Sequence, residues 1–565
     1  ADDGSNTDGF MTEHMEFADQ LAGYVESEHP EFLVNKLYYD AYKKDMTAGT
    51  YPDVRSGLQK LLKDGLLLFN YTGHGGTTAL SDEKVLTQTD INQFTYTHLP
   101  VWVTATCDFT RFDDLNTSAG EDVFLNKSSG GIALFTTVRV AYSRPNFPIN
   151  DNVIRNLFER NNGRRRTLGE VMQATKNTLS SVYKLGFCLI GDPAVKMAYP
   201  EFGMKVTTVN GQSVDGNSIS FKALEKITVE GEVLDASGQL VTDFTGIVNP
   251  TVKDSKVTVT CLKNSNKDDS PAFTFTDYPN TIFIGNDSVR NGKFSFTFTV
   301  PKDISYSNLQ GKMNLYAVDT ESGNEAQGNF DNFIVGGTSD TAETDTIGPE
   351  IRALYLNDTT FMDGGQVNTT PYFVAELWDK SGVNITGSSV GHDMMLVIDE
   401  STVLSYNLNS YYELLPGEDG TGIVKFPIPA LEPGKHTAEF WVWDILNNST
   451  VRTFTFEVVE GLKPFLFDVI ATPGIAREQV TFHLMHNRPE SRMRVGIMVY
   501  DLAGRQLWKH EESGTSGLFE NYTVSWDLTS GGARMRPGVY IYRAAISTDN
   551  SKDATKARKF IILGE

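Results

Sequence analysis

Cysteine is scarce in this sequence. Only Cys107, Cys188 and Cys261 occur among its 565 residues, which is too few for a disulfide framework. The sequence also lacks any run of about 18 apolar residues, so we predict no membrane-spanning helix. Basic residues are in deficit, with 49 Lys and Arg against 72 Asp and Glu, and the net charge of −23 argues against nucleic-acid binding. These absences favour a solvent-facing protein.

The chain is nevertheless long and apolar enough for several hydrophobic cores. Its 565 residues predict about three to five domains. An apolar fraction of 40%, with 34 Phe, allows sizeable cores. Cys188 falls within the apolar run 187–190, so we expect it to pack in one of them.

The most informative stretch runs from residue 66 to residue 107. An apolar run at 66–71 breaks at a Gly-rich turn that contains His74, and residues 81–94 have helical spacing. Residues 100–106 then form a second apolar run, rich in β-branched and aromatic residues, which ends at Cys107. Two strands joined by a helical crossover are expected to be parallel. We therefore predict that His74 and Cys107 leave the same carboxyl edge of one sheet, where open α/β sheets carry their reactive groups.

A cysteine and a histidine at such an edge permit nucleophilic catalysis. The imidazole of His74 can take the thiol proton of Cys107 and later return it to a leaving amine. The N–H groups of Gly75 and Cys107 are placed to hold a developing oxyanion. The simpler alternative is that Cys107 is a buried strand residue and His74 an ordinary turn residue.

Four motifs in this part of the chain resemble the gingipain family of cysteine peptidases. They are Asn70-Tyr71-Thr72-Gly73-His74-Gly75, Cys107 after an apolar strand, Gly130-Gly131-Ile132-Ala133-Leu134-Phe135-Thr136-Thr137, and Leu189-Ile190-Gly191-Asp192-Pro193-Ala194. The resemblance covers roughly residues 1–200. It implies a caspase-like α/β catalytic domain with Cys107 as nucleophile and His74 as general base.

The loops after the two central strands resemble one branch of this family. Residues 108–114 and 118–122 are acidic and contain Ser and Gly, and with 136–143 they are similar to the cell-surface sortases of type IX secretion in Bacteroidetes. In that interpretation Arg139 and Tyr142 wall the substrate subsites. The alternative is an ordinary surface loop.

The first residues should supply the acid that orients the catalytic imidazole. The resemblance places this role on Asp3, with Asp8 as the alternative. The sequence starts as if just after a strand, and we expect it to be the C-terminal part of a larger protein whose missing N-terminal part completes the sheet edge. Residues 13–28 and 51–62 predict helices and 32–39 a strand. His14 is expected on a solvated helix face.

From residue 201 the pattern becomes all-β. Short alternating runs such as 226–230, 256–260 and 294–298 recur between Gly, Asn and Asp turns, which is typical of a β-sandwich. Residues 335–346 read as a linker. We predict β-sandwiches at 201–345, 346–460 and 461–565, after a catalytic domain at 1–200.

The last module resembles the C-terminal signal domain of type IX secretion cargo, which is immunoglobulin-like. Its predicted strands include the two around the Asp/Gly turn of 495–508, and the runs 537–544 and 559–563. The resemblance implies docking on an outer-membrane β-barrel.

Together these features predict a caspase-like α/β domain followed by immunoglobulin-like β-sandwiches. The resemblance implies a cell-surface, outer-membrane-associated cysteine transpeptidase. Such an enzyme would remove the C-terminal signal domains of cargo proteins through a thioester and transfer the cargo to anionic lipopolysaccharide. We predict neither a cofactor nor a metal site. A secreted gingipain-type endopeptidase, or a non-catalytic surface scaffold, are the alternatives.

Overall fold

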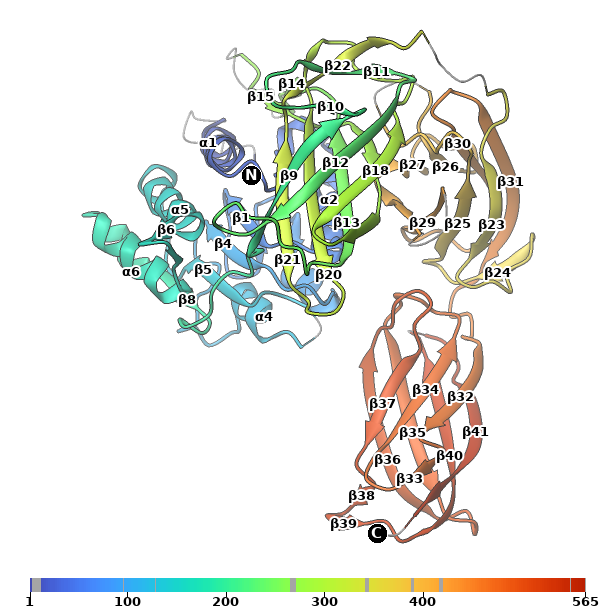
Figure 1. Cartoon of the computed structure of the whole chain (residues 1–565). Coiled ribbons are helices and arrows are strands. Elements are labelled where there is room, and N and C mark those ends of the chain that lie inside the picture. Colours follow the sequence, from blue (N-terminus) through green and yellow to red (C-terminus); the bar gives the residue numbers. More distant parts are fainter. Residues whose placement is uncertain are drawn as a thin grey trace. The chain divides into compact units, whose positions relative to one another are not determined.

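The computed structural model describes residues 1–2, 12–94, 96–127, 129–264, 271–340, 345–387, 391–415, 420–548 and 550–563 (Figure 1). The chain forms two compact units. The first comprises Ala1–Lys222, Lys226–Phe298 and Ser305–Gly337, and the second comprises Ala223–Glu225, Thr299–Ile304 and Thr338–Glu565. In the part of the chain so described, no helix has the length and hydropathy needed to cross a bilayer.

The first unit begins with a four-stranded sheet in the order β1-β4-β5-β8. Strands β1 (Leu68–Thr72), β4 (Val101–Ala105) and β5 (Ala133–Thr137) are parallel, and β8 (Phe187–Ile190) runs antiparallel to β5. The predicted parallel pairing of the two central strands is therefore confirmed. His74 and Cys107 each lie two residues beyond the end of their strand, at the same edge.

Helices cover both faces of this sheet, because residues of its central strands alternate between two cores. Val101 and Val103 of β4 pack with α1, α5 and α6, whereas Trp102 packs with α2, α3 and α4 on the other face. The helices are α1 (Glu13–Glu28), α2 (Pro52–Asp64), α3 (Gln88–Gln93), α4 (Ala119–Leu125), α5 (Ser143–Phe158) and α6 (Leu168–Thr178). This three-layer arrangement is the predicted caspase-like α/β fold.

Two predicted elements of this domain are wrong. Residues 81–94 are not one helix: β2 (Ala79–Leu80) and β3 (Leu86–Thr87) form a hairpin, and only α3 follows it. The positive φ of Ser81 and Lys84 suits the turn of a hairpin and not a helix. Residues 33–38 are not a strand either, and the chain enters a 3₁₀ turn, η1, at Tyr39–Ala41.

The α/β domain also contains two short elements that the sequence did not predict. They are the hairpin β6 (Arg160–Asn161) with β7 (Arg164–Arg165), and the 3₁₀ helix η2 (Val182–Gly186).

The rest of the first unit is a β-sandwich. Its larger sheet contains β9 (Phe202–Val209), β10 (Gln212–Ser213), β12 (Lys226–Leu234), β13 (Gly246–Lys253), β16 (Thr281–Ile284), β17 (Asp287–Arg290), β18 (Lys293–Thr299), β20 (Lys312–Asp319) and β21 (Glu325–Phe330). The smaller sheet contains β11 (Ile219–Ala223), β19 (Leu309–Gln310) and β22 (Phe333–Thr338). The alternating Phe294, Phe296 and Phe298 of β18 all point inward, as the sequence pattern predicted.

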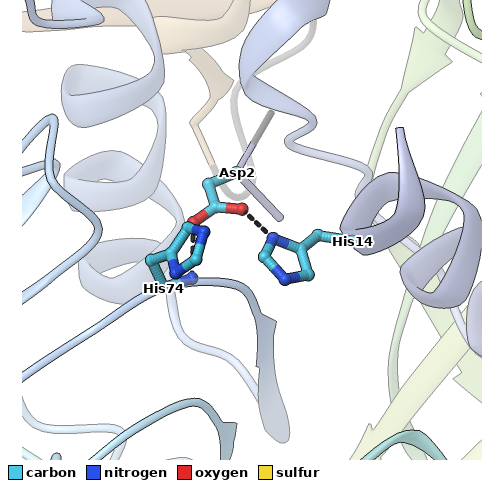
Figure 2. Close-up of side chains that lie close together, drawn as sticks. All are labelled: Asp2, His14 and His74. Atoms are coloured by element: carbon cyan, nitrogen blue, oxygen red, sulfur yellow. Dashed lines mark hydrogen bonds and ion pairs between the residues drawn. The ribbon is translucent and has the colours of Figure 1, made fainter. Parts of the chain in front are cut away.

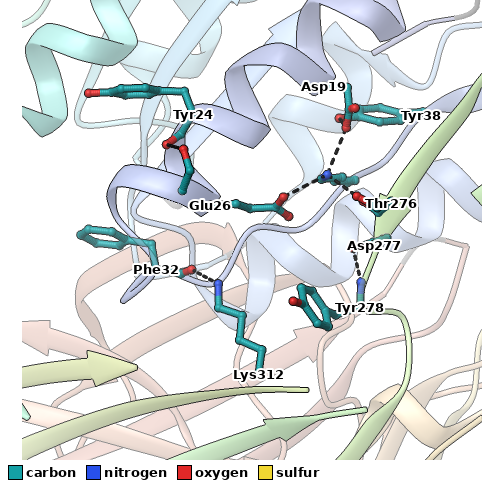
Figure 3. Close-up of polar contacts among 11 residues, drawn as sticks. Asp19, Tyr24, Glu26, Phe32, Tyr38, Thr276, Asp277, Tyr278 and Lys312 are labelled. Carbon is teal, nitrogen blue, oxygen red and sulfur yellow. Dashed lines mark hydrogen bonds and ion pairs between the residues drawn. The ribbon is translucent and has the colours of Figure 1, made fainter. Parts of the chain in front are cut away.

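A separate hairpin of this sandwich, β14 (Val257–Thr260) with β15 (Thr274–Asp277), contacts the α/β domain (Figure 3). The buried ammonium of Lys36 donates to the Thr276 carbonyl at 2.8 Å and pairs with Asp19 at 3.0 Å and Glu26 at 3.3 Å. Met15 of α1 packs in one small core with Phe275 of the hairpin. The hairpin therefore fixes α1, which carries His14.

The second unit contains two more sandwiches, each closed around its own apolar core. The first consists of β23 (Glu350–Leu356), β24 (Gly365–Val367), β25 (Tyr372–Trp378), β26 (Met395–Ile398), β27 (Ser405–Asn407), η3 (Asn409–Tyr411), β28 (Tyr412–Leu414), β29 (Thr421–Pro427), β30 (Gly434–Trp443) and β31 (Ser449–Val458). The last sandwich consists of β32 (Leu466–Thr472), β33 (Ile475–Ala476), β34 (Val480–His486), β35 (Met493–Tyr500), β36 (Gln506–Gly514), β37 (Tyr522–Trp526), β38 (Thr529–Ser530), β39 (Ala533–Arg534), β40 (Gly538–Ser547) and β41 (Ala554–Ile562).

Candidate active site

The loops that follow β1 and β4 approach each other closely at the carboxyl edge of the sheet. A methyl group on Gly75 would lie only 2.4 Å from the Thr106 hydroxyl, so the backbone after His74 packs directly against the residue before Cys107. Only glycine permits this distance. The structure thus brings the His74 loop and the Cys107 loop together, as the sequence predicted.

Cys107 is half-buried, and its thiol is held by the loop that follows β5. The Sγ–H donates to the Ala141 carbonyl at 3.0 Å, and the Ala141 N–H donates to Sγ at 3.5 Å. Burial raises the pKa of the Cys107 thiol, and the neighbouring charge of Asp108 adds to the rise, whereas the Ala141 contact opposes it. The thiol therefore needs a base before it can act as a nucleophile.

The imidazole of His74 has a nitrogen with unused hydrogen-bonding capacity. Among the residues that the structure describes, no group hydrogen-bonds to its buried Nε2, and the ring does not bond the Cys107 sulfur. His74 and Cys107 are therefore neighbours through their loops, without a hydrogen bond between their side chains. Catalytic hydrogen bonds are often long in the free enzyme and tighten when substrate binds.

A buried carboxylate that the sequence did not single out, Asp2, lies beside His74 (Figure 2). Asp2 is only 1% exposed. Its Oδ2 accepts the backbone N–H of His74 at 2.5 Å and the Tyr71 hydroxyl at 3.3 Å. Burial acts to raise the pKa of Asp2, but the charges and hydrogen bonds of His14 and His74 lower it to about 2. Asp2 is thus a buried anion that holds the His74 loop.

The other oxygen of Asp2 contacts His14, which overturns the prediction of a solvated helix face for this residue. His14 is 7% exposed, and its Nδ1 bonds Asp2 Oδ1 (Figure 2). Its ring meets the ring of His74 edge to face, with centroids 4.9 Å apart. Burial lowers the pKa of His14, but the charge and hydrogen bond of Asp2 outweigh burial and leave it raised.

Gly73 makes this cluster possible. A methyl group at Gly73 would lie 2.5 Å from the Tyr71 hydroxyl and 2.7 Å from the Asp2 carboxyl carbon. The Tyr71 hydroxyl also donates to the His74 carbonyl at 2.7 Å. The Gly-rich turn therefore serves two close approaches, one to Asp2 through Gly73 and one to Thr106 through Gly75.

The two N–H groups predicted to hold an oxyanion are available. Within the described parts of the chain, neither the Gly75 N–H nor the Cys107 N–H donates to a protein acceptor. Unpaired backbone N–H groups beside a nucleophile are the donors that acyl transfer requires.

The residues predicted to line the substrate subsites, Arg139 and Tyr142, lie in the described structure, whereas the predicted acids do not. Arg139 lies in the loop after β5, but its guanidinium makes two hydrogen bonds to Asp113, at 3.0 and 2.5 Å. Tyr142 is 65% exposed and its ring contacts Tyr183 edge to face. Asp3 and Asp8, the predicted acids, lie outside the described residues.

Sequence reasoning missed Asp2 and His14. Their contact links residue 2 to residue 14 on α1, and no spacing rule for a strand or helix connects those positions. The sequence offered one signal for Asp2: it stands next to Asp3, in the loop that was predicted to supply the acid. The ligand atoms of Asp2, His14 and His74 all lie within 4.8 Å of one another, so these three residues could also hold a metal ion.

Comparisons with known proteins give one family match and several similar solved structures. Residues 1–198 match the model of Peptidase family C25. Among solved structures, dimeric latent PorU from Porphyromonas gingivalis is 34% identical, over 91% of this chain and 47% of that chain, with a TM-score of 0.32. The RgpB pro- and mature domains of P. gingivalis are 18% identical over 59% of this chain and 65% of that chain, with a TM-score of 0.28.

The chain thus spans about half the length of the PorU chain that it matches. No curated protein sequence matches it. The family match covers all the motifs that resemble gingipains, from the loop of Asp2 through His74 and Cys107 to β8. Residues 1–198 therefore match the model of the gingipain family of cysteine peptidases, C25, over the whole α/β domain.

Proposed function

We propose that this chain is a cell-surface cysteine transpeptidase, which cleaves the C-terminal signal domain from cargo proteins and passes the cargo to an amine. The observation that supports the proposal is the close approach of Gly75 to Thr106, which brings the His74 loop next to the Cys107 loop; among the described residues, the N–H groups of Gly75 and Cys107 donate to no protein acceptor. We also propose four domains, with boundaries near residues 200, 345 and 460.

In the first half-reaction, Cys107 acts as nucleophile and His74 as general base. The Cys107 sulfur attacks the peptide carbonyl carbon as its proton passes to His74, and the N–H groups of Gly75 and Cys107 hold the oxyanion. His74 then returns the proton to the leaving amine, the C–N bond breaks, and a thioester remains on Cys107.

The second half-reaction decides between a transferase and a protease. An incoming amine gives its proton to His74 and attacks the thioester carbonyl, after which the thiolate leaves and recovers the proton. Water in the same position gives hydrolysis with the same residues. The resemblance of residues 108–122 and of the last module to type IX secretion sortases and cargo favours an amine, with anionic lipopolysaccharide as its source and an outer-membrane β-barrel as the anchor.

The test is a partition experiment on the full chain. A cargo tail with its C-terminal signal is incubated with a labelled amine, and the new C-terminus is analysed by mass spectrometry. We expect the label on the cargo, and we expect its loss in Cys107→Ala and His74→Ala. Cys188→Ala is the matched control, since Cys188 is also a half-buried free cysteine.

Three outcomes separate the alternatives. A cleaved but unlabelled cargo would replace transfer with hydrolysis and identify an endopeptidase. Cleavage that survives Cys107→Ala would overturn the assignment of the nucleophile. Absence of both cleavage and labelling of Cys107 by an iodoacetamide probe at neutral pH would leave only a surface scaffold.

A further inference from the structure

We infer that Asp2, His14 and His74 form a binding site for one Zn²⁺ ion, which holds the peptidase in an inactive state. Two imidazoles and one carboxylate converge here, with ligand atoms within 4.8 Å of one another (Figure 2). Two nitrogens and one oxygen, with a water in the fourth position, are a common donor set for Zn²⁺. The site itself does not depend on the proposed function, but its effect on activity does.

The distances require only a small adjustment. Ligand bonds of about 2.0–2.2 Å in a tetrahedral site separate the donor atoms by about 3.4 Å. The three donor atoms therefore need to shift by an ångström or so to surround one ion. His14 and Asp2 must move apart, because they now share a hydrogen bond whose proton would leave as the metal enters.

The surroundings of the three residues suit a metal better than a solvated cluster. Asp2 and His14 are buried, and Nε2 of His74 is buried without a partner among the described residues. The Asp2 carboxylate is oriented by the Tyr71 hydroxyl and the His74 N–H, as outer-shell donors orient carboxylate ligands. The core that contains Met15 and Phe275 fixes α1 and with it His14. The donors are therefore held close to the metal position before any ion binds.

The donor types also select the metal. Ca²⁺ and Mg²⁺ prefer six or more oxygen ligands, which this cluster does not offer. Imidazole suits Zn²⁺ and the neighbouring transition metals. Within the described residues the cluster excludes Cys107, whose sulfur is bonded to Ala141. We therefore expect a site without a thiolate ligand, in contrast to the Cys–His site expected if the Cys107 thiolate itself bound Zn²⁺.

Metal binding would inhibit the enzyme for a direct reason. A lone pair of His74 that is donated to Zn²⁺ cannot take the proton of Cys107, so the thiol stays protonated and unreactive. Removal of the ion by a chelator restores the base. The cluster would thus keep a surface peptidase silent until the metal is removed.

The test titrates the metal-free full chain with Co²⁺ in place of Zn²⁺, because the visible absorption of Co²⁺ reports which ligands it has. We expect a d–d band of a four-coordinate site, with one ion per chain, and its displacement by Zn²⁺ in calorimetry. His14→Ala and His74→Ala should each weaken metal binding by about a hundredfold or more. His98→Ala, an exposed histidine of the same domain, is the matched control and should bind normally.

The two ligand variants protect the test from a folding artefact. His74→Ala leaves the buried pair of Asp2 and His14 intact, so loss of the Co²⁺ band in this variant, with an unchanged far-UV spectrum, reports the site and not unfolding. A chain that binds no metal, or that binds equally well in both variants, overturns the inference. A sulfur charge-transfer band that disappears in Cys107→Ala also overturns it.

Failure of this inference and failure of the proposed function can be told apart. The Co²⁺ band is read without substrate, so a chain that binds metal but, after a chelator has removed the metal, neither cleaves nor labels at Cys107 would refute the function alone. A chain that cleaves cargo equally well with and without Zn²⁺ would refute the inhibition.

Discussion

Two histidines, the buried His14 in the α/β domain and the half-buried His486 in the last sandwich, have opposite environments. His14 bonds a buried carboxylate, and the charge of Asp2 raises its pKa against the effect of burial. His486 donates from Nε2 to the Ser516 hydroxyl at 2.8 Å and accepts the Arg488 N–H at Nδ1, 3.1 Å away. Burial, and then the positive charge of Arg488, lowers the pKa of His486 to about 4.

The difference shows two ways in which a fold can bury an imidazole. The sandwich keeps His486 neutral, since its two nitrogens are both satisfied by neutral partners beside a cation. The catalytic domain keeps a charged pair, which is expensive to bury unless both partners are present. A buried charge at the rim of an active site is the arrangement expected for chemistry, whereas a neutral buried imidazole is expected for packing.

The largest effect should follow removal of the charge partner in the catalytic domain. Asp2→Ala leaves His14 buried without its carboxylate and removes the acceptor of the His74 N–H. Breaking a buried ion pair in this way destabilises a domain by about 3–5 kcal/mol. We expect faster amide hydrogen exchange in α1 and β1, measured by mass spectrometry, and unchanged exchange in the last sandwich.

The control for this prediction is an ion pair in the last sandwich. Asp468 pairs with Arg558 at 2.8 Å on the surface, where an ion pair contributes little. Asp468→Ala should leave exchange unchanged throughout. If α1 and β1 exchange at the same rate in Asp2→Ala and in the wild type, the Asp2–His14 pair contributes no more to stability than the surface pair of Asp468 and Arg558.

The second prediction concerns pH and the last sandwich. A folded-state pKa of about 4, below the ordinary value of 6.5, means that the unfolded chain binds a proton at pH 4–6.5 that the folded chain does not. The contribution of neutral His486 to the free energy of unfolding is therefore complete above pH 6.5. It is lost as the pH falls toward 4, and the loss amounts to about 3 kcal/mol. Hydrogen exchange of β34 should accelerate across this interval.

His486→Gln is the variant that isolates this effect. A glutamine amide can still donate to Ser516 but does not titrate in this range. Exchange of β34 in the variant should lose most of its dependence on pH between 6.5 and 4. A wild-type sandwich that is equally protected at both pH values would contradict the neutral burial of His486.

The third prediction tests the close approach that the catalytic domain needs. Gly75→Ala places a methyl group 2.4 Å from the Thr106 hydroxyl and forces the His74 loop away from Cys107. A displacement of about 1 Å at a catalytic group lowers kcat by about a hundredfold. Peptide cleavage measures this change. A methyl group on the neighbouring Gly76 would have no atom within 4 Å, so Gly76→Ala should retain activity.

A second substitution sharpens the test. Thr106→Ala removes the hydroxyl and leaves the nearest remaining atom, Cβ, 3.3 Å from the new methyl group. The double variant Gly75→Ala with Thr106→Ala should therefore recover part of the activity. No recovery would mean that the loss in Gly75→Ala has another cause than this contact.

The sandwiches were the easier part of the molecule to predict from sequence. Strand β18 alternates inward Phe with outward Lys, Ser and Thr, and this period of two is visible without a structure. In the catalytic domain the same reasoning worked for β1 and β4, whose apolar runs end at glycine or cysteine. It failed for 33–38, because β propensity produces a strand only where a neighbouring strand can pair with it.

The site was predictable only in part, for a physical reason. His74 and Cys107 follow the ends of adjacent parallel strands, so their proximity is a consequence of strand order, which the sequence indicates. The contact of Asp2 with His14 depends on how α1 packs against the sheet and against Phe275 of the sandwich. Such tertiary packing leaves no periodic signal, and His14 therefore looked like any polar residue of a helix.

The smallest expected effect comes from two similar surface bridges, one in each region. Arg139 makes two hydrogen bonds to Asp113 beside the candidate site, and Arg558 makes three to Asp468 in the last sandwich. Arg139→Ala and Arg558→Ala should both leave thermal stability almost unchanged, since exposed pairs contribute little. Only Arg139→Ala should alter KM for a cargo peptide, if Arg139 walls a subsite as the sequence resemblance predicts.

Asp113→Ala separates the two roles that Arg139 can have. If the bridge only holds the loop in place, removing either partner breaks it and changes KM by the same factor. If the guanidinium also binds the substrate, Asp113→Ala frees it and should leave KM unchanged or lower it, whereas Arg139→Ala raises it. Equal KM values for wild type, Arg139→Ala and Arg558→Ala would instead reduce Arg139 to the structural role of its counterpart in the sandwich.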